Sequence, residues 1–89
     1  MAEIIRKAVA GTMESSDAYV EIEPGAGEIE IRLESVVQQQ FGSAIETVIL
    51  EVLQDCGVEN VKVSVIDRGA LDCVIRARVE TAVLRGKGD

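Results

Sequence analysis

The stretch S-V-V-Q-Q-Q-F-G-S-A-I-E-T-V-I-L-E-V-L-Q-D-C, Ser35 to Cys56, decides the fold because its apolar residues recur at steps of three and four. Ser35 and Gln38 fit a capping box, in which the serine oxygen accepts from a free amide and the glutamine reaches back. Gly57 supplies the left-handed position that ends many helices. We therefore predict a helix over residues 35–56, about 30 Å long at ~1.5 Å per residue. Its apolar stripe comprises Val37, Phe41, Ala44, Ile45, Val48 and Val52, widened by Ile49, Leu53 and Cys56.

Short segments on both sides of this helix alternate apolar and polar residues, which is the pattern of half-buried strands. The turn signal Pro24–Gly27 joins two of them and predicts an antiparallel hairpin with a strongly acidic outer face. Most such faces are simply solvated, and we favour that interpretation over a docking surface for a basic partner. The expected strands are Ala8–Met13, Ala18–Glu23, Glu28–Glu34 and Val61–Val65.

The last segment of the chain fits two structures. Apolar residues alternate from Leu71 to Val79 as in a strand, but their spacing from Leu71 to Val83 also fits a helix. Enrichment in β-branched residues and a turn at Asp67–Gly69 favour a strand to Val79, followed by a short helical tail.

Together these elements predict an α+β fold in two layers, an antiparallel β-sheet with one long helix packed on one face. A chain of 89 residues with 47% hydrophobic content can form one modest core, so we expect a single domain over residues 1–89. With one Phe, one Tyr and no Trp, that core must be aliphatic.

Composition excludes several classes of function. The chain has no histidine, which removes His-activated nucleophiles and imidazole metal ligands, and we expect no metal site and no catalytic residue. Cys56 and Cys73 form no C-x-x-C unit, which favours reduced thiols and a cytoplasmic location. A net charge of -7 and the scarcity of aromatic residues argue against nucleic-acid binding and against anionic membranes. No apolar run approaches the ~20 residues that span a bilayer.

Two polar features remain. Between the first two strands, Gly11–Asp17 places the adjacent hydroxyls of Ser15 and Ser16 on an exposed tip, with no base to activate either. From these residues alone, an ordinary turn is the simpler interpretation.

The second feature is basic. If the last two strands pair, Arg76 and Arg78 lie near Lys62 on the outer face of the sheet. These three residues can form a phosphate-contacting patch or can balance the charge of the acidic hairpin. Charge balance is the simpler interpretation.

Residues 10–17, A-G-T-M-E-S-S-D, resemble the A-G-T-[LM]-E-S-S-D signature of the acyl carrier subunit (gamma chain) of citrate lyase. The resemblance covers nearly the entire chain, and the combination of its two outer blocks is specific. Its further blocks are Gln40–Gly42, Gly57-Val58, Asp67–Cys73 and Arg76–Glu80.

The resemblance implies a covalent prosthetic group, 2'-(5''-triphosphoribosyl)-3'-dephospho-coenzyme A, joined by a phosphodiester to Ser15, with Ser16 as the alternative. A separate prosthetic-group transferase forms this ester. The thiol at the end of the group carries acetyl and citryl thioesters between two partners, the alpha subunit (acyl transferase) and the beta subunit (citryl lyase), while citrate is cleaved to acetate and oxaloacetate. The carrier itself is then a non-catalytic subunit, and any divalent metal belongs to the lyase partner.

Other functions compete with this one. The carrier subunits of citramalate lyase and malonate decarboxylase use the same kind of group, and the full E-S-S-D block favours the citrate or citramalate enzyme. Helical carriers are disfavoured because the chain lacks Asp-Ser-Leu, and lipoyl or biotinyl domains because no lysine lies at a suitable hairpin tip. An alternative from another class is a non-carrier interaction module whose Ser15-Ser16 turn is bare or phosphorylated.

Overall fold

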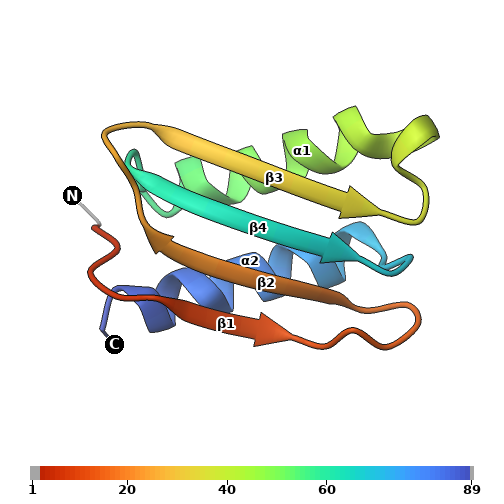
Figure 1. Ribbon diagram of the computed structural model, residues 1–89, viewed down its shortest axis with the longest axis horizontal. Helices are drawn as coiled ribbons and strands as arrows, with labels where there is room; N and C mark the ends of the chain where they lie inside the picture. The colour runs from red at the N-terminus through yellow and green to blue at the C-terminus, as the bar shows by residue number, and fades with distance from the viewer. Residues whose placement is uncertain (1–2, 89) are drawn as a thin grey trace.

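The computed structural model describes residues 3–88, apart from the side chain of Gln38. Four strands form one sheet in the order β1-β2-β4-β3, and both helices lie against the same face of it (Figure 1). The elements in chain order are β1 (Ala8–Gly11), β2 (Ala18–Pro24), β3 (Ile29–Ser35), α1 (Gln38–Asp55), β4 (Val61–Asp67) and α2 (Asp72–Gly86).

The predicted α+β, two-layer architecture is confirmed, but the sheet is mixed rather than antiparallel. β1–β2 and β2–β4 are antiparallel pairs, whereas β3 and β4 run parallel. The reason is α1, which connects β3 to β4 and returns the chain to the end of the sheet from which β3 began. The predicted hairpin of β2 and β3 is wrong, because β4 lies between these two strands.

The predicted strand over Leu71–Val79 is also wrong, since this segment belongs to α2. Leu71 is only the residue before the helix, and it is 71% exposed. Cys73 and Ala77, which the alternation placed on the same face, are exposed as well. The buried residues instead follow the helical period: Ile75, Val79, Ala82, Val83 and Gly86. The sheet is therefore covered by two helices and not by one.

The predicted helix over residues 35–56 is confirmed with shorter bounds. α1 is preceded by Val37, and among the described side chains none caps it. Ser35 ends β3, and its Oγ accepts from the Val37 N–H at 3.1 Å, so it stabilises the connection before the helix. The Gln38 half of the predicted capping box lies outside the described residues.

The core between the sheet and the helices is aliphatic, as predicted. Alternate residues of β2 and β4 point toward the helices and are buried, and one side of each helix packs onto them. Each such Val, Leu or Ile contributes about 1.5–3 kcal/mol by leaving water. The largest fully buried apolar side chains are Ile22, Ile49, Leu53, Ile75, Val20, Val58, Val61, Val63, Val65, Val79 and Val83.

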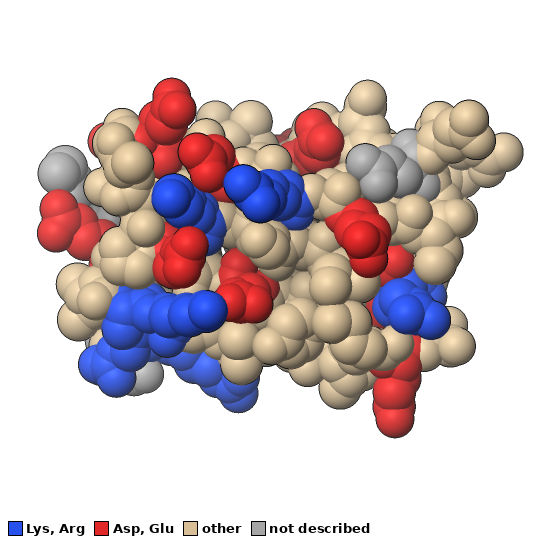
Figure 2. Space-filling view, in the orientation of Figure 1, with Lys and Arg blue, Asp and Glu red and all other residues tan. Residues whose placement is uncertain are grey.

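The topology gathers four segments at one end of the molecule, on the right in Figure 1. They are the loop between β1 and β2, the end of β4, the start of α2 and the connection from β3 to α1. The other face of the sheet carries no helix, and charged side chains of both signs are scattered over it (Figure 2). No helix within residues 3–88 is long and apolar enough to cross a membrane.

Candidate functional site

The loop between β1 and β2 ends in a tight turn with Ser15 and Ser16 at its two corners. The Asp17 N–H donates to the Glu14 carbonyl at 3.1 Å, and φ is 67° at Ser16. Among residues 3–88, Ser16 is the only non-glycine residue with positive φ. A positive φ confined to the second corner is the pattern of a type II turn, a position that usually requires glycine. Ser15 therefore occupies the first corner.

The same turn is joined to the end of β4 by a β-bulge. The Ser16 N–H donates to the Arg68 carbonyl at 2.9 Å, and the Arg68 N–H donates to the Asp17 carbonyl at 2.9 Å. Two residues of one strand thus oppose one residue of its partner, and the first of the two has positive φ, as in a G1 bulge. This bulge continues the antiparallel pairing of β2 and β4 beyond Ala18 and Asp67.

Asp17 is held on the other side by α2. Arg78 Nε and Nη2 donate to the two carboxylate oxygens of Asp17 at 2.9 and 3.0 Å, in a bidentate pair. The Thr12 hydroxyl and the Ala18 N–H also donate to this carboxylate, each at 2.7 Å. The hydrogen bonds from Arg78, and then those from Thr12 and Ala18, hold the pKa of Asp17 well below its ordinary value. The same pair raises the pKa of Arg78.

Beneath the loop, a second carboxylate fixes the end of β4. Asp67 is 1% exposed, and its carboxylate oxygens accept three hydrogen bonds. The Ser35 hydroxyl donates at 2.7 Å, and the N–H groups of Gly69 and Ala70 donate at 3.2 and 2.8 Å. The carboxylate therefore ties β3 and the β4–α2 connection together, directly next to the Arg68 backbone that pairs with the turn.

Both serine side chains at the corners are exposed. Within residues 3–88, no side chain donates to or accepts from either hydroxyl, and the chain contains no histidine. A hydroxyl in this position is accessible even to a large partner protein, but no neighbouring group among the described residues would activate it as a nucleophile. The site has the geometry of an attachment point.

The predicted basic residues do not come together. Arg76 and Arg78 lie on α2, while Lys62 lies on the opposite, open face of the sheet. Arg76 pairs with Glu51 of α1 at 2.6 Å. Expecting the three side by side was wrong because it required a strand at residues 71–79.

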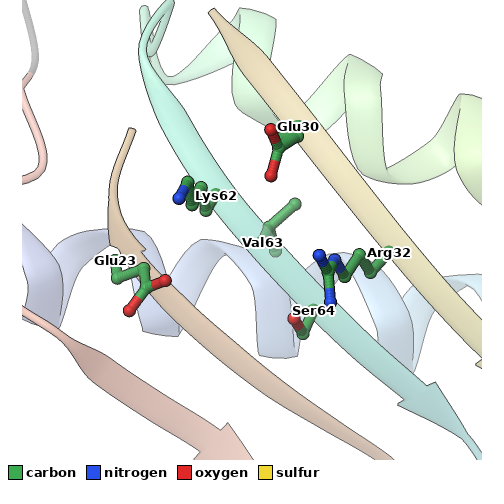
Figure 3. A pocket seen from close by; sticks show the side chains of 6 residues that line it. All are labelled: Glu23, Glu30, Arg32, Lys62, Val63 and Ser64. Atoms are coloured by element: carbon green, nitrogen blue, oxygen red, sulfur yellow. The ribbon is translucent and has the colours of Figure 1, made fainter. Parts of the chain in front are cut away.

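Lys62 borders a shallow hollow of about 170 Å³ on the open face. It lies on β4 between Glu23 of β2 and Glu30 of β3 (Figure 3). Arg32 reaches from β3 toward Ser64 of β4 in the same hollow (Figure 3). Alternating acids and bases on neighbouring strands favour mutual charge balance there.

The thiols and carboxylates do not build a metal site in the described part of the chain. No group of three or more Cys, Asp or Glu side chains within residues 3–88 is arranged to hold a metal ion. Burial raises the pKa of Cys56, which makes it a weak nucleophile.

Comparison with known proteins agrees with this geometry. The acyl carrier protein (ACP) family model described as malonate decarboxylase delta subunit (MdcD) matches residues 5–86. The chain belongs to this acyl carrier family. The citrate lyase acyl carrier protein 2 of Salmonella paratyphi A is 54% identical over 84 residues, which are 93% of this chain and 87% of that protein. The citrate lyase acyl carrier protein of Serratia proteamaculans is 55% identical over 84 residues, covering 93% of this chain and 82% of that protein. The resemblance expected from residues 10–17 is thereby confirmed.

A solved structure shares the fold of this acyl carrier. One chain of a Pseudomonas malonate decarboxylase hetero-tetramer, crystallised in complex with malonate, is similar with a TM-score of 0.80 and 26% identity. The match covers 94% of this chain and 87% of that one. The mixed sheet with two helices on one face is therefore an architecture that this chain shares with a component of a multi-subunit decarboxylase.

Proposed function

We propose that this acyl carrier is the non-catalytic carrier subunit of a citrate lyase, with 2'-(5''-triphosphoribosyl)-3'-dephospho-coenzyme A esterified to Ser15. The observation that supports it most directly is the turn. Ser15 is exposed at the first corner of a turn that is braced from two sides, by Arg68 of the β4–α2 connection and by Arg78 of α2. A turn that is fixed by hydrogen bonds and carries an exposed hydroxyl is suited to hold a long covalent prosthetic group.

The structure also gives a reason to prefer Ser15 over Ser16. Ser16 is the residue held at positive φ, and its N–H is engaged with Arg68. Ser15 precedes the bulge, and its modification disturbs neither the strained residue nor the pairing with β4. An ester at the first corner of the turn therefore adds bulk without increasing backbone strain at Ser16 and without breaking its hydrogen bond to Arg68.

When attached, the group supplies a thiol on a long arm, whose thioester activates the acyl chain for carbon–carbon cleavage in a partner's site. This chain contributes the mount: Asp17, Arg78 and Asp67 fix the loop, and Ser15 provides the linking oxygen. Acyl transferase and citryl lyase subunits would supply the catalytic groups, and a separate transferase would form the ester.

Carriers of citramalate lyase and malonate decarboxylase are the alternatives. The family model and the solved structure bear the name of malonate decarboxylase, whereas relatives above 50% identity bear the name of citrate lyase. We favour citrate lyase because the similarity to those carriers is about twice as high along a comparable length.

Intact-mass measurement of the protein purified from its native host tests the attachment. We expect an added mass equal to the esterified group, absent in Ser15→Ala and present in the matched control Ser16→Ala. Fragmentation of the loaded protein should place the added mass within residues 12–17. The complex that copurifies with it should cleave citrate rather than citramalate, and should not decarboxylate malonate.

An unmodified mass would overturn the carrier function, and an increment of a single phosphate would favour a phosphorylated interaction module. Loss of the adduct in Ser16→Ala but not in Ser15→Ala would move the attachment to the second corner. Turnover of malonate alone would assign the carrier to a decarboxylase.

A further inference from the structure

We propose that Arg68 is the residue that contacts the phosphodiester on Ser15, an inference that rests on the proposed attachment of the prosthetic group. The bulge fixes Arg68 directly opposite the turn, since its backbone N–H and C=O both bond to the loop at 2.9 Å, through Asp17 and Ser16. Ser15 is the next residue along. The ester and the Arg68 side chain therefore start from neighbouring backbone positions.

The direction of the Arg68 side chain follows from the alternation along β4. Val65 and Asp67 are buried toward the helices, so the residue after Asp67 falls on the side of the open face, and Arg68 is exposed. Figure 2 shows that face, and basic side-chain atoms stand close to acidic ones at its right-hand end, where β4 ends and the loop between β1 and β2 lies.

Charge makes this contact favourable. A phosphodiester brings negative charge to a loop that already carries Glu14 and Asp17. Asp17 is compensated by Arg78, whereas Glu14 forms no ion pair within residues 3–88. Arg68 forms none there either, so its guanidinium is free to take a phosphate oxygen. Guanidinium and phosphate make bidentate, charge-assisted hydrogen bonds.

The basic residues predicted from the sequence are less well placed for this role. Arg78 already donates from Nε and Nη2 to Asp17, and Arg76 is paired with Glu51. Lys62 pairs in register with Glu23, five residues beyond Ala18 along β2, which is about 17 Å at ~3.3 Å per residue. Among these cations Arg68 alone is both adjacent to the turn and without a carboxylate partner.

Nuclear magnetic resonance of the loaded and unloaded full-length carrier tests the contact. Intact mass first establishes that the carrier is loaded, and fragmentation places the adduct on Ser15. We then expect the Arg68 Nε–Hε resonance to shift on loading, and the shift to shrink at high salt. The matched control is Arg32, which is also exposed on the open face. It lies opposite Ser64 of β4, three residues before Asp67, which is the residue opposite Ala18. Its resonance should not move.

Variants give a second readout that does not depend on lyase turnover. In the loaded protein, Arg68→Gln should change the ³¹P resonance of the phosphodiester, and Arg68→Lys should change it less. Loading should raise Tm by about 4 °C less in Arg68→Gln than in the parent, while Arg32→Gln should match the parent. All four proteins are expected to fold, because Arg68 contributes backbone bonds that the substitutions leave intact.

The outcomes separate the two proposals. A loaded protein in which the Arg68 resonance coincides with that of the unloaded protein would overturn the contact and leave the carrier function standing. Equal ³¹P shifts in Arg68→Gln and Arg32→Gln would overturn it as well. An unmodified mass would overturn the attachment, and with it this contact.

Discussion

Asp67→Ala measures how strongly the end of the sheet that carries Ser15 is held together. Three donors lose their acceptor: the Ser35 hydroxyl and the N–H groups of Gly69 and Ala70. Hydrogen bonds to a charged acceptor are worth about 1.5–3 kcal/mol each. Gly69 is exposed and Ala70 half-buried, so water can replace part of what is lost. We therefore expect the free energy of unfolding to fall by about 3 kcal/mol, which is less than the roughly 4.5 kcal/mol minimum for three bonds whose donors are left without any acceptor.

Urea and thermal unfolding followed by circular dichroism provide the assay. A loss of about 3 kcal/mol lowers Tm by at least roughly 12 °C in a domain of this size. Asp67→Asn keeps an acceptor for the two backbone donors and should lose about half as much. The exposed Asp55→Ala, at the end of α1, should stay within about 0.5 kcal/mol of the parent. An Asp67→Ala protein as stable as Asp55→Ala would refute the reasoning.

Two further predictions concern the turn itself. Ser16→Gly should raise the free energy of unfolding by about 0.5–1 kcal/mol, because glycine adopts positive φ without strain, and calorimetry that shows a loss would contradict this. The second concerns pH. The depressed pKa of Asp17 contributes stability that is present above its ordinary value of 3.8 and is lost as pH falls through the lowered value. In Arg78→Gln a carboxyl ¹³C titration should therefore find a higher pKa for Asp17 than in the parent, still below its ordinary value because Thr12 and Ala18 continue to donate to the carboxylate. An unchanged titration would show that Arg78 is not the main cause.

The hydrophobic periodicity of the sequence was enough to locate most helices and strands, but not to predict which strands pair with each other. The stripe from Ile45 to Leu53 gave α1, and period-two alternation gave four strands, because both signals depend only on which face is buried. Which strands pair depends on how α1 returns the chain, and no local pattern encodes that. The turn at Pro24–Gly27 therefore led to a hairpin, although the strands it joins are separated by β4.

The segment after Leu71 was ambiguous because apolar residues at alternate positions also satisfied a helical period. Charge could have decided it. Asp72 lies in the first turn of α2 and Arg85 in its last, and each complements the helix dipole. With the strand assignment, Arg76 and Arg78 shared a face. In a helix, residues two apart point in different directions, so Arg76 pairs with Glu51 and Arg78 pairs with Asp17.

The structure explains why widely separated blocks of the family pattern occur together in this chain. Three of these blocks contact one another directly. Residues 10–17 form the turn, residues 67–73 pair with it through the backbone of Arg68, and residues 76–80 bind it through the side chain of Arg78. A change in Asp17 therefore leaves Arg78 without its carboxylate, whereas Arg68 holds Ser16 and Asp17 through its backbone alone. As a proposed attachment point, the Ser15 hydroxyl needs no catalytic neighbour. The residues around it supply a turn that holds Ser15 exposed to solvent.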